Sequence, residues 1–209
     1  MSELQNWSAG RISAVVIALL AFGTVALQTT INQGEGTGPI AAFLLLFRYF
    51  TIWSNFAAGV IMTLVALERR VAPWVLFALA TALMQVGIVY HMLLAADHHP
   101  IGLDWWTNLM FHTIIPVSVI VRWLVTSRGD GVTWRSVPTV MIAPVVYTFF
   151  ALIYGEASGF YPYFFLDLPQ YGWARIVLNI AGLSLFFMLL GAALLGIRRG
   201  VARLLSANA

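Results

Sequence analysis

The sequence has no cysteine, no lysine and little charge of any kind. Without cysteine there is no disulfide framework, no thiolate nucleophile, no iron–sulfur cluster and no metal site with a cysteine ligand. Only 9% of the 209 residues are charged, whereas 61% are hydrophobic. A soluble domain of this size carries about 25% charged residues. The composition is that of a membrane protein, and it excludes a disordered chain, a nucleic-acid-binding protein and an ordinary soluble fold.

Six apolar stretches are long enough to cross a bilayer, which takes about 20 helical residues. They lie near residues 12–31, 39–67, 73–96, 105–126, 136–155 and 173–197. The second is long enough to tilt or to begin outside the hydrocarbon, and the first lacks the cleavage pattern of a signal peptide. The connections are short and show no convincing repeat. We therefore expect an all-α bundle of six transmembrane helices that forms one domain over residues 1–209.

The arginines predict the orientation of the chain in the membrane. Nine of the eleven flank the N-terminus, the connections after the second and fourth spans, and the C-terminus, and five of the eight acids lie on the opposite side. By the positive-inside rule, both termini are expected in the cytoplasm. The nine arginines are Arg11, Arg69, Arg70, Arg122, Arg128, Arg135, Arg198, Arg199 and Arg203. The five acids on the opposite side are Glu35, Asp97, Asp104, Glu156 and Asp167.

Two of the expected helices each carry polar side chains on one face. In the second span, Arg48, Thr51 and Asn55 have the spacing i, i+3, i+7. In the fourth span, Asp104, Asn108 and His112 have the spacing i, i+4, i+8. From the helix rise, His112 lies roughly 10 Å and Thr51 roughly 12–18 Å below the outer ends of their helices. Polar side chains in a span are functional-site candidates, because their burial is unfavourable by several kcal/mol. The two residues are able to meet in the outer half of the bundle.

Taken singly, each of these residues has a structural explanation. An intramembrane threonine usually bonds its own helix backbone, a histidine or asparagine can join two helices, and Arg48 can extend toward the interface. Pro116 removes the N–H that would bond the carbonyl of His112, so the helix is expected to kink there. The aromatic loop between Tyr154 and Trp173 is either an interfacial belt or a lid over the bundle. The grouping of the polar residues at one depth favours a site.

A threonine nucleophile and a histidine base would suit this grouping. Thr51 needs a base within hydrogen-bond reach, and His112 is the best-placed imidazole. Asn108, one helical turn from the ring, or Asp104, two turns away, is expected to orient it. Arg48, Asn55 or His91 would donate to an oxyanion or hold a carboxylate. The Gly-x-Ser-x-Gly and His-Glu-x-x-His motifs are missing. The chemistry expected is hydrolysis of a lipid ester through an acyl-threonine, with no cofactor or metal.

Three segments carry a resemblance to a known family. They are Arg48-Tyr49-Phe50-Thr51-Ile52-Trp53-Ser54-Asn55, Asn108-Leu109-Met110-Phe111-His112-Thr113 followed by Pro116, and Tyr161-Pro162-Tyr163-Phe164-Phe165-Leu166-Asp167. Together they resemble the androgen-induced family of six-pass membrane proteins, which includes the androgen-dependent regulator of tissue-factor-pathway inhibitor. The resemblance covers nearly the whole chain and is closest to the prokaryotic branch, which implies the inner membrane of a prokaryote.

The family resemblance implies an activity. Its animal members are threonine hydrolases that cleave fatty acid esters of hydroxy fatty acids, and their nucleophile and essential histidine match Thr51 and His112. The residues after Thr51 depart from the animal pattern. The resemblance therefore implies a membrane lipid esterase more than any named substrate.

Two other classes of function fit part of the pattern. A haem-binding electron carrier would use His91 with His112, but all four histidines lie in the outer half or outer connection, which leaves no ligands for a second haem. A non-catalytic protein that binds or transports a lipid or small solute would use the same polar cluster. Below Asn55 and Pro116 the spans are almost wholly apolar apart from Thr63 and Gln85, which favours a pocket over a conduit.

Overall fold

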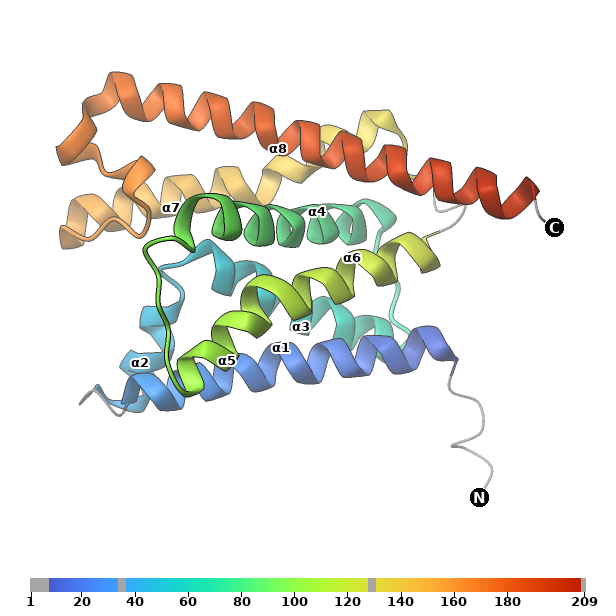
Figure 1. Ribbon diagram of the computed structural model, residues 1–209, viewed down its shortest axis with the longest axis horizontal. Helices are drawn as coiled ribbons and strands as arrows, with labels where there is room; N and C mark the ends of the chain where they lie inside the picture. The colour runs from blue at the N-terminus through green and yellow to red at the C-terminus, as the bar shows by residue number, and fades with distance from the viewer. Residues whose placement is uncertain (1–7, 34–36, 128–130, 208–209) are drawn as a thin grey trace.

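The computed structural model of the protein describes residues 8–33, 37–127 and 131–207. Helices make up 84% of the described residues, which contain no strand. The long helices lie side by side along the long axis of the molecule (Figure 1). Of the residues that predict the orientation, Glu35 and Arg128 lie outside the described ranges.

Twelve helical elements follow one another in the described residues. In chain order they are α1 (Ala9–Gln33), α2 (Pro39–Leu46), α3 (Phe50–Ala66), α4 (Pro73–Val89), the π-helical turn η2 (Tyr90–Leu94), α5 (Leu103–Leu109), the π-helical turn η3 (Met110–Ile114), α6 (Ile115–Thr126), the 3₁₀ helix η4 (Trp134–Met141), α7 (Ile142–Ser158), the 3₁₀ turn η5 (Phe164–Leu166) and α8 (Leu168–Ala207).

Five helical segments are long and apolar enough to cross a membrane, and the bent pair α2–α3 would make a sixth. The five are Ala9–Gln33, Pro73–Leu94, Leu103–Thr126, Trp134–Ser158 and Leu168–Val201. The all-helical fold with five or six such helices agrees with the sequence prediction, and the chain has the architecture of an integral membrane protein.

The second predicted span is not one helix, which corrects the prediction. α2 and α3 meet at an angle of 99°, and residues 47–49 between them leave the helix. Side chains bond the backbone groups that the break exposes: Trp53 Nε1 donates to the Phe47 carbonyl at 2.7 Å, and the Tyr147 hydroxyl donates to the Arg48 carbonyl at 2.6 Å. Broken helices occur inside membranes where the protein satisfies their backbone in this way. Arg48 therefore precedes α3 and does not share a helical face with Thr51.

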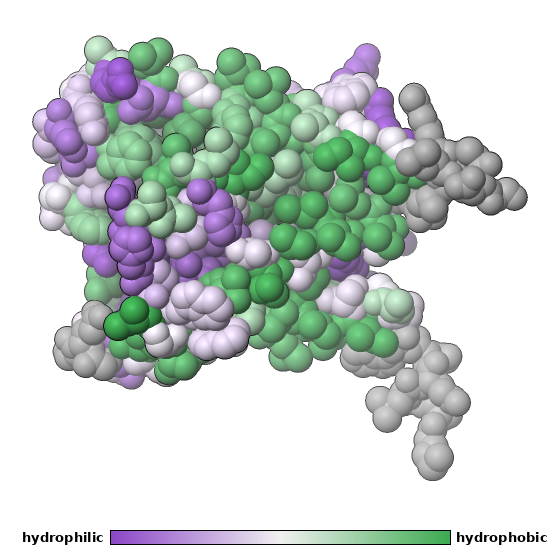
Figure 2. All heavy atoms as spheres, in the orientation of Figure 1, coloured by the Kyte–Doolittle hydropathy of each residue, from purple (hydrophilic) through white to green (hydrophobic). Residues whose placement is uncertain are grey.

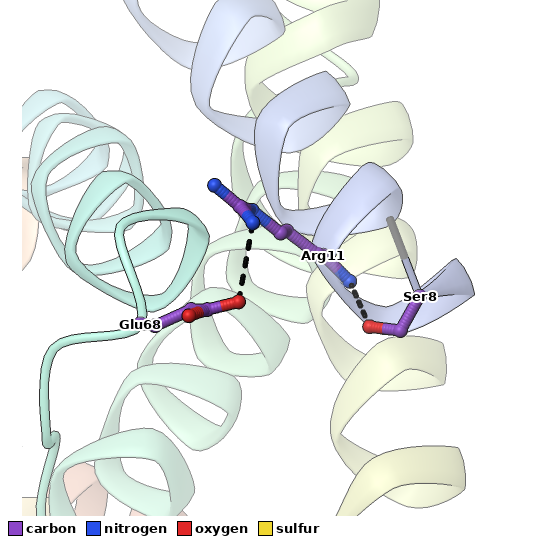
Figure 3. A network of polar contacts seen from close by, with 3 residues as sticks. All are labelled: Ser8, Arg11 and Glu68. Carbon is purple, nitrogen blue, oxygen red and sulfur yellow. Dashed lines mark hydrogen bonds and ion pairs between the residues drawn. The ribbon is translucent and has the colours of Figure 1, made fainter. Parts of the chain in front are cut away.

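The two ends of the bundle differ in polarity. α1 begins and α8 ends at the same end, which we call the arginine end because Arg11, Arg122 and Arg198 lie there, and the α2–α3 break marks the opposite end, the site end (Figure 1). Polar residues gather towards the ends and apolar residues dominate the middle (Figure 2). At the arginine end, Arg11 forms an ion pair with Glu68 at 3.1 Å, which connects α1 to the turn after α3 (Figure 3).

The irregularity predicted at Pro116 takes the form of the π-helical turn η3. The N–H of Ile115 bonds to the carbonyl of Met110, five residues back, and Pro116 has no N–H to give to Phe111 or His112. Asn55 Nδ2 donates to the Phe111 carbonyl instead, at 3.1 Å. The His112 carbonyl faces Gly87 of α4, where a Cβ atom would lie only 3.0 Å from it.

Candidate functional site

Thr51 and His112 are in contact at the site end. Thr51 lies in the first turn of α3, directly after the helix break, and His112 lies in η3. Thr51 Oγ1 and His112 Nε2 are 3.4 Å apart. This is a long hydrogen bond, which is common between a nucleophile and its base when no substrate is bound. The helix break and the π-helical turn therefore adjoin each other at this pair.

The backbone determines which nitrogen of His112 carries the proton. His112 Nδ1 lies 3.0 Å from the carbonyl oxygen of Asn108. A carbonyl can only accept, so Nδ1 must be the donor, and in the neutral ring Nε2 then has the free lone pair. That lone pair faces the hydroxyl of Thr51. The orienting group is thus the Asn108 backbone, whereas the sequence suggested the side chain of Asn108 or Asp104.

Tyr90 fixes the plane of the imidazole. Its ring stacks on His112 with 3.8 Å between ring centroids and 16° between planes. The Tyr90 hydroxyl accepts a 2.7 Å hydrogen bond from Asn108 Nδ2 and lies 3.2 Å from His98 Nδ1. The side chain of Asn108 therefore positions Tyr90, which in turn restricts the rotation of His112.

Asn55 connects the two helices behind the pair. It has no exposed surface, and its Nδ2 donates both to the Thr51 carbonyl at 2.8 Å and to the Phe111 carbonyl. It lines neither cavity described below. Its position corresponds to a brace between α3 and η3 and not to the oxyanion donor that the sequence suggested.

The loop between α7 and α8 folds over the start of α3. The Tyr163 hydroxyl accepts a hydrogen bond from the N–H of Phe50 at 3.1 Å, and the Arg48 guanidinium lies over the ring of Phe160, 4.3 Å from its centroid. Tyr161 packs so tightly on Gly155 that a Cβ atom there would come within 2.2 Å of the ring. Of the two expectations for this loop, belt or lid, its contacts match the lid.

Two cavities meet at Thr51. One, of about 500 Å³, is the polar cavity, and the other, of about 380 Å³, is the apolar cavity. Both are in the size range of small-molecule sites. Thr51, Tyr90, Leu94 and Tyr163 line both. The polar cavity also has Gln28, Arg48, His98, Asp104, Asn108 and His112 in its wall, and the apolar cavity has Gln85, Val86, Tyr147, Phe165, Leu183 and Phe187.

Two of the residues predicted for the site have roles at its edge or outside it. Asp104 lines the polar cavity and accepts a 2.9 Å hydrogen bond from Gln28 Nε2. His91 is exposed, bonds to Thr113 Oγ1 at 3.0 Å and lines neither cavity. His91 and His112 thus do not face a common cavity, as a pair of haem ligands would. Among the described residues, no group of three or more histidines and carboxylates has metal-site geometry.

Sequence reasoning missed three residues of the site. Tyr90 and Tyr163 belong to aromatic segments that are typical of a membrane interface, and their polar ends gave no separate signal. Gln28 accepts a hydrogen bond from Thr107 and donates to Asp104. The sequence does contain a feature that points to Gln28, because an amide side chain is unusual in the outer part of the first apolar stretch.

Comparison with protein-family models, with curated proteins and with solved structures finds no match for this chain. The resemblance to the androgen-induced family therefore rests on the residues quoted above and stays a prediction.

Proposed function

We propose that the protein is an integral-membrane esterase that hydrolyses esters of amphipathic lipids. The observation that carries the proposal is the arrangement of Thr51, His112 and the Asn108 carbonyl. It provides a hydroxyl, a base with its lone pair toward that hydroxyl, and a group that fixes the base, which is the general pattern of nucleophilic acyl transfer.

The reaction needs only protein groups and water. His112 Nε2 takes the proton of Thr51 as Oγ1 attacks the carbonyl carbon of the ester. The tetrahedral intermediate collapses, the bond to the alcohol oxygen breaks, and His112 returns the proton to the departing alcohol. Water, deprotonated by the same imidazole, then attacks the acyl-threonine, which releases a carboxylic acid and restores Thr51.

Tyr163 is the proposed donor to the oxyanion. Its hydroxyl lies at the start of α3 beside Thr51 and accepts from the Phe50 N–H, so its own proton is available to a substrate oxygen. Burial raises the pKa of Tyr163 to about 12, so the hydroxyl stays protonated at physiological pH. The positive end of the α3 dipole adds to the stabilisation of negative charge there.

The two cavities support an ester of a long-chain acid. The apolar cavity would take the acyl chain, and the polar cavity would take the alcohol portion. In the polar cavity Arg48 is available to a carboxylate or other anionic group. The other predicted residues have supporting roles: Asp104 holds Gln28, Asn55 holds α3 against η3, and Asn108 holds Tyr90.

The proposal also covers the family to which the chain would belong and its location in the cell. The chain would belong to the prokaryotic branch of the androgen-induced family and lie in the inner membrane, with both termini in the cytoplasm and the site end facing out. The arginines at the opposite end support that orientation by the positive-inside rule.

The direct test is labelling of purified protein by a fluorophosphonate probe, together with turnover of simple esters. Thr51→Ala and His112→Ala should both lose labelling and turnover while eluting as folded protein. The controls are Thr63→Ala, whose hydroxyl bonds its own helix in α3, and His91→Ala, whose imidazole lies outside both cavities. Both controls should keep the signal. A folded wild type that neither labels nor hydrolyses esters would overturn the esterase and favour a protein that only binds lipids.

A further inference from the structure

The apolar cavity is partly open to the outside of the molecule. Its wall contains three residues that are exposed at the surface: Val145 and Phe149 of α7, by 42% and 65%, and Trp173 of α8, by 61%. The other residues of the wall, such as Val86 of α4 and Tyr147 on the inner side of α7, are buried or half-buried. The opening of the cavity therefore lies at α7 and α8.

α7 and α8 face each other across the cavity instead of packing together. α8 packs mainly on η4 and α4, and its direct contact with α7 is slight among the described residues. Figure 1 shows α8 along one edge of the bundle. Each of the two helices turns a stripe of side chains, repeated at the helical period, into the cavity wall. The stripe of α8 is Ile180, Leu183, Ser184 and Phe187, and that of α7 is Pro144, Val145, Thr148, Phe149 and Leu152.

The loop between α7 and α8 covers the cavity toward the site end. Tyr163, Phe165 and Leu166 of this loop line the cavity, and Leu166 is buried. Asn179 of α8 donates to the Phe165 carbonyl at 2.9 Å, which fastens the loop to α8. A molecule that came from that end would have to pass through the polar cavity. Contact of a hydrocarbon chain with water and charged groups on that path would be unfavourable.

The gap between α7 and α8 adjoins the lipid chains of the membrane. It lies between Trp134–Ser158 and Leu168–Val201, two of the segments that are long and apolar enough to span a bilayer. Val145 and Phe149 are near the middle of the first segment. Thr148 adds little polarity to the wall, because its hydroxyl donates to the Pro144 carbonyl of its own helix at 2.8 Å. An acyl chain that moves through this gap would stay among apolar groups.

We propose that the gap between α7 and α8 is a lateral portal, through which an acyl chain of a lipid in the surrounding bilayer enters the apolar cavity. The lipid would not have to leave the membrane, and its head group would remain at the site end. That such a lipid is also the substrate rests on the proposed function, whereas the entry of its chain does not require hydrolysis.

Photo-crosslinking in a bilayer tests the portal without turnover. Purified Thr51→Ala protein, which lacks the proposed nucleophile, is placed in phosphatidylcholine nanodiscs that contain a trace of phosphatidylcholine with a diazirine in one acyl chain. After irradiation, mass spectrometry should find label on Val86 and Tyr147, which are buried in the cavity wall. Phe77 and Met62, which are buried and line neither cavity, should stay unlabelled.

A bulky side chain at the gap should exclude the lipid. In the same background, Val145→Trp should lower the labelling of Val86 and Tyr147 about tenfold, as expected for an overfilled apolar site. Val146→Trp is the matched control, because Val146 is the next residue of α7, is 52% exposed and lines neither cavity. This control should keep the labelling.

A second pair of variants widens the gap and tests the opposite effect. Phe149→Ala should increase the labelling of Val86 and Tyr147, whereas Ile153→Ala, at an exposed position of α7 outside both cavities, should not. Gel filtration shows which variants are folded. Absence of label from Val86 and Tyr147 before either substitution, or equal labelling within both pairs of folded variants, would overturn the portal. Lack of esterase activity in the wild type would leave these results unchanged and would count against the proposed function alone.

Discussion

The two ends of the bundle use polar side chains in opposite ways. At the arginine end, Arg198 is buried and donates to the carbonyls of Ser127 and Val132, at 3.1 and 2.8 Å, and its guanidinium lies over the ring of Trp123. Through these contacts α8 binds Ser127 and Val132, which follow α6 in the chain. The largest hydrophobic cluster, which draws on α1, α3, α4, α6, η4 and α8, includes Trp123 and Val132. The polar groups at this end hold the bundle together.

At the site end, polar side chains stabilise departures from regular helix. Trp53, Tyr147 and Tyr163 bond the backbone around the α2–α3 break, and Asn55 bonds a carbonyl of the π-helical turn η3. Two cavities remain between these elements. The difference suggests that stability and proposed catalysis reside at separate ends, so substitutions at one end should leave the property of the other largely unchanged.

The largest effect is expected from Tyr163→Phe, which removes the proposed oxyanion donor but no bulk. The turnover number should fall about 100- to 1000-fold, the range for loss of one such donor. The melting temperature should also fall, because the Phe50 N–H loses its acceptor. Turnover of a simple ester measures the loss of activity. Tyr161→Phe is the matched control in the same loop, since Tyr161 lines neither cavity. Equal activity of the two variants would remove Tyr163 from the mechanism.

Arg198→Met should separate the two ends most clearly. It leaves two buried carbonyls without their donor, which should lower the free energy of unfolding by about 2–3 kcal/mol. The melting temperature in detergent should then drop by about 5–10 °C. Turnover per folded molecule should not change. Arg199→Met, which removes only a contact with Trp134, should shift melting much less. A large loss of specific activity in Arg198→Met would show that the ends are coupled.

Asn55→Leu should affect both properties moderately, because Asn55 braces the site without touching the cavities. The Phe111 carbonyl would lose its donor, for a loss of about 1–2 kcal/mol in stability. A shift of η3 relative to α3 should also reduce turnover, by about tenfold. Ser54→Ala is the neighbouring control, since the buried Ser54 hydroxyl has no hydrogen-bond partner among the described residues. This variant should be neutral or slightly stabilising. If Asn55→Leu lowers the melting temperature but leaves the turnover number unchanged, Asn55 has a structural role only.

Gly87→Ala should give the smallest effect. The added Cβ atom would lie 3.0 Å from the His112 carbonyl and 3.9 Å from Pro116, so η3 must move by a few tenths of an ångström. A displacement of that size should lower turnover by about two- to fivefold. At Gly23 an added Cβ atom would meet no atom of the other described residues within 4 Å, apart from the adjoining backbone of α1. Gly23→Ala should therefore leave activity intact and stabilise α1 slightly. Unchanged turnover in Gly87→Ala would show that the position of His112 tolerates this shift.

The sequence predicts the helices and the meeting of Thr51 with His112 better than it predicts how the site is built. Hydrophobic length locates the spans, and the polar side chains within them point to the pair. The depth calculated for Thr51 assumed one continuous second helix, which the α2–α3 break contradicts. The α2–α3 break has no signal in Phe47–Tyr49, which holds neither glycine nor proline. The side chains that stabilise it, Tyr147 and Tyr163, are 99 and 113 residues away from their partners in the chain. Tertiary hydrogen bonds of that range are not visible as a local pattern.

The junction of two cavities at one hydroxyl sets an order of events in time. Once the ester bond breaks, the acyl chain would stay tethered to Thr51 inside the apolar cavity, while the alcohol is free to leave the polar one. Its departure opens the space in front of His112 to the water that completes the cycle. The alcohol would therefore be released before the acid. Rapid mixing should show an initial burst of alcohol equal to the concentration of sites whenever the second half of the cycle is the slower one.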